Sequence, residues 1–270
     1  MSTPIEKIRL LLDAFDKASV RIHTLGRWEV WREGEDIPSK SWGRDKTIQL
    51  FQFLVTARDR HGLHKEQIID RIWEDAEQKG GDRDFKVALH GINKILEPQR
   101  ASRSEPKYIL RQGLSYQLNQ KELWIDAQAF EAFIAIGNEY LDSDKAAAQL
   151  AYRHAISLHQ GMYLPNRMYE DWSSEERERL QVLALAAYVT LAESLVEVNP
   201  LESVRLTQLA LKIDPSWEDA YRIQMSAFSA KGNRPAAIKA FNQCKKVLEE
   251  EYGIDPLPET ERLMESILER

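Results

Sequence analysis

Four side chains that can donate hydrogen bonds recur at three- and four-residue steps near the middle of the chain. They are Arg83, Lys86, His90 and Asn93. This spacing places them on one face of a helix, and an α-helix fits the major groove of DNA. Lysine suits the acceptors of guanine and asparagine can bond adenine twice, so we expect Lys86, His90 and Asn93 to face base edges. We expect Arg83 and Lys94 to hold phosphates beside the groove.

A second polar group follows that helix. The sequence YILRQGLSYQL alternates around Gly113, which predicts two strands joined by a tight turn. Lys107, Arg111 and Gln112 would anchor this hairpin on DNA, with Arg111 as the candidate for minor-groove insertion. Lys46, at the expected start of an earlier helix, would add a phosphate contact.

The helix that must carry the donors reads DRDFKVALHGINKILEP. Its apolar residues recur at steps of four, three and four, which predicts a buried face. Those residues are Phe85, Leu89, Ile92 and Leu96. Two helices are expected before it, near Lys46 and Lys65, and an alternating, tryptophan-containing stretch at 20–42 predicts a small antiparallel sheet. Sheet, three helices and hairpin together predict a winged helix.

From about residue 125 the strand signals end and helical periodicity continues. The expected helices lie near 126–140, 144–159, 172–198, 201–213, 216–231, 234–252 and 258–269. A faint repeat of 34 residues pairs Ser203, Thr207 and Ala210 with Ala237, Phe241 and Cys244. Small residues at such positions let helices pack closely, as in tetratricopeptide repeats. A generic helical bundle is the alternative.

The composition is that of an ordinary globular protein. A chain of 270 residues favours two domains, and the single cysteine, Cys244, excludes an internal disulfide. No apolar run approaches the ~20 residues that span a bilayer, and the N-terminus lacks a cleavage site for a signal peptide. We therefore expect a cytoplasmic protein with no membrane association.

Charge is distributed unevenly. The chain has a net charge of −6, but residues 79–121 contain nine basic and four acidic residues. Phosphate binding depends on the local density of cations on one surface, so this segment suits DNA better than the overall charge suggests. A solvated surface with no partner is the alternative explanation.

Enzymatic signals are weak. Neither G-x-x-x-x-G-K-[ST] nor G-x-G-x-x-G occurs, so a nucleotide-binding loop is unsupported. His61 and His64 have no second pair of ligands nearby, and His154 and His159 are five residues apart, an awkward spacing for one helical face. We predict no enzyme activity, no catalytic residue, no metal site and no cofactor.

Two motifs in the second half are more specific. GMYLPNRMYEDWSSEERERL at 161–180 and the ending from Leu248 to Thr260 resemble the Streptomyces antibiotic regulatory protein (SARP) family of bacterial activators. The first motif matches at five positions: Gly161, Leu164, Trp172, Glu176 and Arg177. The second resembles the family pattern L-x-x-E-[LY]-G-[IV]-x-P-x-P-E-T. The resemblance covers about residues 20–270.

The resemblance implies a fold, domains and partners. It implies an α+β, OmpR-type winged helix at 20–120, followed by an all-α, tetratricopeptide-like bacterial transcriptional activator domain at 121–270. Residues 1–19 would be an N-terminal helical arm. The protein would bind double-stranded DNA as a homodimer on direct repeats near promoters and contact RNA polymerase. The helical domain would be open to a peptide or small-molecule effector.

The recognition helix departs from the family pattern. Gly91 and Asn93 stand where arginines are common in the family. The sequence therefore leaves an alternative open, a tetratricopeptide adaptor whose winged helix binds DNA weakly or not at all.

Overall fold

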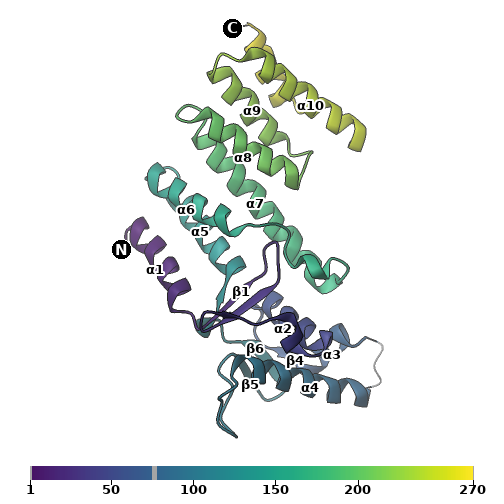
Figure 1. Ribbon diagram of the computed structural model, residues 1–270. Coiled ribbons are helices and arrows are strands. Elements are labelled where there is room, and N and C mark those ends of the chain that lie inside the picture. The colour runs from purple at the N-terminus through teal and green to yellow at the C-terminus, as the bar shows by residue number, and fades with distance from the viewer. Residues whose placement is uncertain (1, 75–77, 270) are drawn as a thin grey trace. The chain divides into compact units, whose positions relative to one another are not determined.

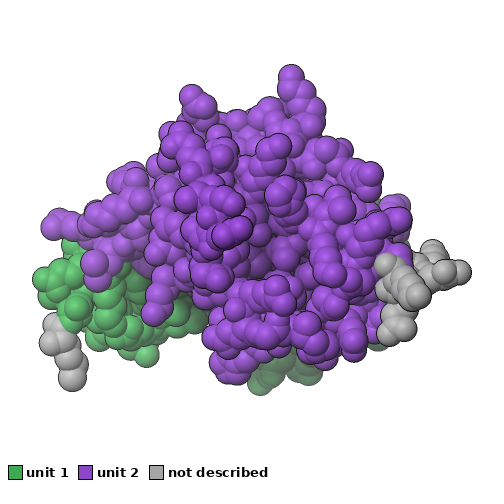
Figure 2. Space-filling model, turned by 90° about the horizontal axis from the view of Figure 1, so that it is seen from below, with its two compact units in different colours: residues 1–8, 130–159, 179–270 green, residues 9–129, 160–178 purple. Residues whose placement is uncertain are grey.

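The computed structural model describes residues 2–74 and 78–269 (Figure 1). The chain forms two compact units, shown in different colours in Figure 2. One, here called the winged-helix unit, comprises residues 9–129 and 160–178. The other, the helical unit, comprises residues 1–8, 130–159 and 179–270. Helix α1 (Pro4–Lys17) has residues in both.

The winged-helix unit begins with a four-stranded sheet. Its strands are β1 (Val20–His23), β2 (Glu29–Arg32), β3 (Glu35–Asp36) and β7 (Trp124–Ile125), in the order β3-β2-β1-β7. Strands β1 and β2 pair antiparallel with Ile22 opposite Val30, and β7 pairs parallel to β1. The tight turn between β2 and β3 uses Glu33 and Gly34 at φ 51° and 85°. The predicted sheet at 20–42 is confirmed, and β7 adds a strand that the sequence did not predict.

Three helices and a second small sheet complete this fold. The helices are α2 (Asp45–Thr56), α3 (Lys65–Ile72) and α4 (Gln78–Leu96). The sheet consists of β4 (Leu63–His64), β5 (Ile109–Gln112) and β6 (Ser115–Leu118), in the order β4-β6-β5. Strands β5 and β6 form the predicted hairpin, and Gly113 takes the positive φ of 62° that its turn requires. This is the arrangement of a winged helix.

Aromatic side chains fill the core of this unit. Phe51 on α2 stacks on Trp42 and meets the edge of Trp28. Phe85 on α4 contacts Tyr116 on β6 with ring centroids 5.0 Å apart. That contact fixes α4 against the wing hairpin, because both rings are buried.

Residues 160–178 return to the winged-helix unit after two helices, α5 (Asp126–Tyr140) and α6 (Lys145–Leu158), and we call them the return segment. Tyr163 forms a bridge with Leu25, and the Leu164 N–H donates to the Thr24 carbonyl at 2.9 Å. The sequence did not predict that this part of the chain packs with the winged helix.

The helical unit is an array of antiparallel helices. They are α5 (Asp126–Tyr140), α6 (Lys145–Leu158), α7 (Ser174–Ser194), α8 (Pro200–Ile213), α9 (Glu218–Ala230), α10 (Arg234–Tyr252) and α11 (Pro258–Glu269), of which α5 and α7 begin in the other unit. These bounds confirm the seven predicted helices to within a few residues.

The predicted repeat of 34 residues is visible in this array. Asn199 and Asn233, which are 34 residues apart, cap α8 and α10, and each side chain accepts a hydrogen bond from the third residue of its helix. A proline follows within the first turn in both cases. The small residues predicted to pack between helices are buried: Ser203, Thr207, Ala210, Ala237 and Cys244.

Candidate nucleic-acid interface

Helix α4 buries the apolar face that its sequence predicts. Phe85, Ile92 and Leu96 are buried, and Leu89 is half-buried. Gly91 lies against α2, where an added Cβ would come 3.2 Å from Cγ2 of Thr47. These contacts orient the helix and leave its opposite face to solvent.

The exposed face of α4 carries a row of basic residues. Arg83, Lys86, His90 and Lys94 are all exposed, and Val87 beside them is 48% exposed. Their three- and four-residue steps form one continuous stripe along the helix. We call these five residues the α4 stripe. It offers cations and hydrogen-bond donors to a nucleic acid, with one apolar contact among them.

Asn93 requires a correction. The spacing of the donors predicted that it would face bases, but it is buried, with 6% of its surface exposed. Its Oδ1 atom has no hydrogen-bond partner among the described residues. A stripe at helical spacing is wide enough to include a position that turns inward, and Lys94 occupies the exposed position instead.

Gly91 and Asn93, which stand where the family commonly has arginine, therefore face the interior of the winged-helix unit and not solvent. Gly91 faces Thr47 and Asn93 is buried. An arginine side chain at either position would have to extend from the packed side of α4 to reach solvent. The departures leave the four basic side chains of the α4 stripe in place.

Carboxylates hold part of the stripe. Asp82 accepts hydrogen bonds from Lys65 and, with 2.6 Å between Oδ2 and Nζ, from Lys86. These bonds, that from Lys65 first, lower the pKa of Asp82 below its usual value. Arg83 donates to Asp84 at 3.0 Å, which raises the pKa of the guanidinium. A phosphate would compete with these partly exposed carboxylates for the cations, and ion pairs near the surface are weak.

The wing presents the predicted Arg111 and Gln112, both exposed. Arg111 donates from Nε to the Gly113 carbonyl at 2.8 Å, and its guanidinium lies 5.8 Å from the centre of the Tyr116 ring. These contacts hold the side chain along the hairpin. Leu114 at the tip is 47% exposed and gives the wing an apolar end.

The remaining two predicted contacts are engaged within the protein. Lys107 forms an ion pair with Glu122 at 2.9 Å, which raises the pKa of its amine. The Lys46 amine donates to the carbonyl of Ile72. Lys46 is thus hydrogen-bonded to the end of α3. Lys46 and Lys107 are both exposed.

The sequence analysis did not name two further cations of the winged-helix unit, Lys65 and Arg103, as DNA contacts. Lys65, at the start of α3, shares Asp82 with Lys86 and so releases Lys86 from part of that attraction. Arg103 lies in the exposed loop between α4 and β5. The basic loop sequence around Arg103 was a usable signal, whereas the approach of Lys65 to Asp82 depends on how α3 packs beside α4.

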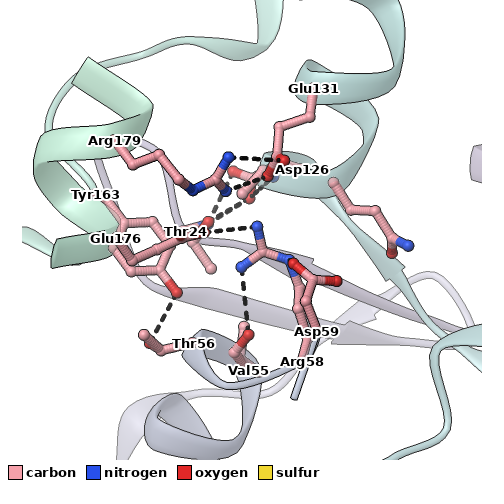
Figure 3. Close-up of polar contacts among 12 residues, drawn as sticks. Thr24, Val55, Thr56, Arg58, Asp59, Asp126, Glu131, Tyr163, Glu176 and Arg179 are labelled. Atoms are coloured by element: carbon pink, nitrogen blue, oxygen red, sulfur yellow. Dashed lines mark hydrogen bonds and ion pairs between the residues drawn. The ribbon is translucent and has the colours of Figure 1, made fainter. Parts of the chain in front are cut away.

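The return segment packs against the C-terminal end of α2. Arg58, which follows α2, is buried and donates to Glu176 at 2.6 Å and to the Val55 carbonyl (Figure 3). Tyr163, whose pKa burial raises, forms a hydrogen bond of 2.9 Å with Thr56 (Figure 3).

The five positions of the first sequence motif all serve this packing. Trp172 meets the ring of Phe53 edge to face, and Arg177 donates to the carbonyls of Tyr163 and Arg167. Gly161 lies against Gly26, and Leu164 adopts a left-handed conformation at φ 43°.

Within the described ranges, no group of three or more histidine, cysteine, aspartate or glutamate side chains is arranged to hold a metal ion. In that part of the chain, none of the helices combines the length and apolarity needed to cross a membrane. Burial raises the pKa of the Cys244 thiol to about 12, which disfavours the reactive thiolate.

Comparisons with known proteins agree with this architecture. The family model described as "Bacterial transcriptional activator domain" matches residues 125–268. The solved structure of "Mycobacterium tuberculosis EmbR in complex with low affinity phosphopeptide" is similar in fold, with a TM-score of 0.80 at 18% sequence identity. That match covers 94% of this chain and 66% of the EmbR chain. No curated protein sequence matches the chain significantly.

Proposed function

The chain belongs to the bacterial transcriptional activator domain family, in the SARP-type arrangement of a winged helix followed by a helical domain, and we propose that it activates transcription by binding specific DNA sequences. In this proposal α4 enters the major groove and the hairpin of β5 and β6 contacts the neighbouring backbone or minor groove. Both elements belong to one compact unit, so they would act together.

The α4 stripe is the observation that carries the proposal. Three cations and a histidine lie on the face of α4 that the core leaves exposed. Lys86 and His90 are central in the stripe and would read base edges, while Arg83 and Lys94 would hold phosphates. Arg111 and Gln112 would anchor the wing. Asn93 has no part in this interface, because it is buried.

The remaining partners follow from the SARP-type arrangement. We propose that the protein binds direct repeats near promoters as a homodimer and contacts RNA polymerase there. Bacterial DNA lies in the cytoplasm, so this is where the protein would act. These statements rest on the family and on the winged helix.

Selection from a pool of random 40-base-pair duplexes with the purified full chain tests the proposal. We expect an enriched motif that occurs twice in the same orientation, and an electrophoretic shift whose affinity falls steeply with added salt. No enrichment, together with no shift at low salt, would overturn it.

A protein-binding adaptor is the second candidate. The observation in its favour is that Arg83, Lys86 and Lys107 already have carboxylate partners. One variant distinguishes the DNA-binding activator from the adaptor. Asp82→Asn removes the competing carboxylate and should strengthen the DNA complex of an activator, whereas an adaptor should show no shift with either protein.

A further inference from the structure

A groove on the helical unit carries chemistry that DNA binding does not use. Side chains from α7, α9 and α11 line a cavity of about 600 Å³. Pockets that hold ligands typically measure ~300–1,000 Å³. Because alternate helices of the array contribute, the groove belongs to several repeats at once, and an extended ligand could contact all of them.

The groove has an apolar floor. Val189 and Val196 contribute from α7 and the turn after it, Ile223 from α9 and Leu263 from α11. Aliphatic side chains in such a groove favour an occupant that has an aliphatic or aromatic side chain to bury.

The charged residues of the lining are predominantly acidic. Glu193, Asp219 and Glu259 share the lining with one cation, Arg222, and Glu259 also pairs with Arg262 outside the lining at 2.9 Å. The Arg222 guanidinium is already engaged, because it bonds Asp219 and donates from Nη1 to the Thr260 hydroxyl at 3.1 Å.

Glu193 is exposed and forms no ion pair within the part of the chain that the structure describes. An occupant with lysine or arginine would therefore meet an uncompensated carboxylate, whereas an acidic occupant would be repelled.

Trp217, the N-cap residue of α9, also lines the groove. Its indole Nε1 is buried and has no hydrogen-bond partner among the described residues. A buried donor without an acceptor is unfavourable, and a small rotation of the indole that exposes Nε1 to the groove would let a main-chain carbonyl of the occupant satisfy it. Tryptophan is also among the residues that contribute most to binding at protein interfaces.

We propose that this groove binds a basic peptide segment of a partner protein. An apolar side chain of the segment lies on the floor, a lysine or arginine lies against Glu193, and a main-chain carbonyl accepts a hydrogen bond from Trp217. This inference does not depend on DNA binding by the other unit.

Fluorescence anisotropy with the full chain tests the groove. The probe is a fluorescein-labelled nonapeptide with leucine at its centre and lysines on both sides, and its partner peptide has glutamates in place of the lysines. We expect the lysine peptide to bind at least about tenfold more tightly. Equal binding of the two peptides, or no binding of the lysine peptide up to millimolar concentration, would overturn the proposal.

Variants locate the binding. Ala186 is exposed in the lining, so Ala186→Lys adds a cation without disturbing the core and should weaken the lysine peptide about tenfold. Glu193→Gln and Trp217→Phe should each weaken it about threefold. Glu265→Gln is the matched control, since Glu265 is an exposed carboxylate of α11 outside the lining. An equal loss of peptide affinity with Glu265→Gln would show that binding depends on the overall acidic charge and would overturn the proposal. Ala186→Lys should leave the electrophoretic shift with DNA unchanged, because the groove and the α4 stripe are separate sites.

Discussion

Nη2 of Arg58 lies 2.6 Å from Oε1 of Glu176, although 118 residues separate the two in the chain. The side chain of Arg58 is 1% exposed and that of Glu176 is 13% exposed. The pair joins the end of α2 to the return segment within one compact unit. The winged helix therefore depends on a part of the chain that follows α5 and α6.

Removing one partner of this pair should destabilise the protein strongly. Glu176→Gln removes the close counter-charge of the buried Arg58 guanidinium and leaves the exposed Asp59 carboxylate at 3.9 Å, and breaking a buried pair in this way costs about 3–5 kcal/mol. Urea denaturation measures the loss. The double variant Arg58→Met with Glu176→Leu should recover much of it, because it removes both charges; a double variant no more stable than the single one would contradict this account.

Alanine substitutions at two glycines with nearly equal φ distinguish the cost of backbone strain from the cost of a packing clash. Gly26 and Gly34 have φ of 86° and 85°, but a Cβ on Gly26 would lie 2.6 Å from the carbonyl carbon of Gln160, whereas one on Gly34 meets nothing within 4 Å. Gly34→Ala should cost only the strain of a positive φ, about 1–2 kcal/mol. Gly26→Ala should cost about 1–3 kcal/mol more, because it forces the return segment away. Equal unfolding free energies for the two variants would show that this contact contributes nothing.

Lys94 should contribute one phosphate contact. Lys94→Ala should weaken binding to all DNA sequences alike and reduce the slope of log affinity against log salt by about 1. Titrations between 50 and 200 mM salt, concentrations typical for such work, measure the slope. Lys212→Ala, an exposed lysine of α8, is the control and should leave the slope unchanged.

Asn93 and His90 should behave oppositely in a selection for bound sequences. Asn93→Ala should leave the preferred bases unchanged, because its side chain is buried. His90→Ala should relax the preference at one position, because His90 is exposed at the centre of the α4 stripe. A changed preference with Asn93→Ala would restore the role that its spacing predicted.

Asp45 should link stability to pH. Arg167 donates to both Asp45 oxygens, and this holds the pKa of the carboxyl below its usual value of 3.8. The pair therefore stabilises the fold above pH ~4 and stops doing so as pH falls through the lowered pKa. Because Asp45 is largely exposed, the effect should be at most about 1 kcal/mol. Asp45→Asn should lower the unfolding free energy at pH 7 and flatten its decline between pH 5 and 2, measured by urea denaturation.

The helices could be predicted because their burial follows a periodic pattern. Phe85, Ile92 and Leu96 share one face of α4, and the structure buries all three. The hairpin could be predicted from Gly113 and its alternating neighbours. The domain boundary at 120–121 stays a prediction, because it concerns which parts of the chain fold independently.

The site was harder to predict, because periodicity gives the angle of a residue around a helix but not the width of its buried face. Asn93 illustrates this: it lies at helical spacing from His90 and is nevertheless buried. The return segment could not be predicted by any local pattern, since the contacts of Glu176 and Tyr163 join residues more than a hundred positions apart. The family motif marked these residues without revealing what they pack against.

The place of the return segment in the chain also bears on synthesis at the ribosome. The strands, α4 and the hairpin are translated before residue 130, yet the buried Arg58 guanidinium gains its close contact with the Glu176 carboxylate only when residue 176 emerges. A nascent chain therefore lacks this buried ion pair while α5 and α6 are made, and contacts of such long sequence separation form slowly. DNA-binding competence should consequently appear late in translation, after the helices that interrupt the unit in sequence have left the ribosome.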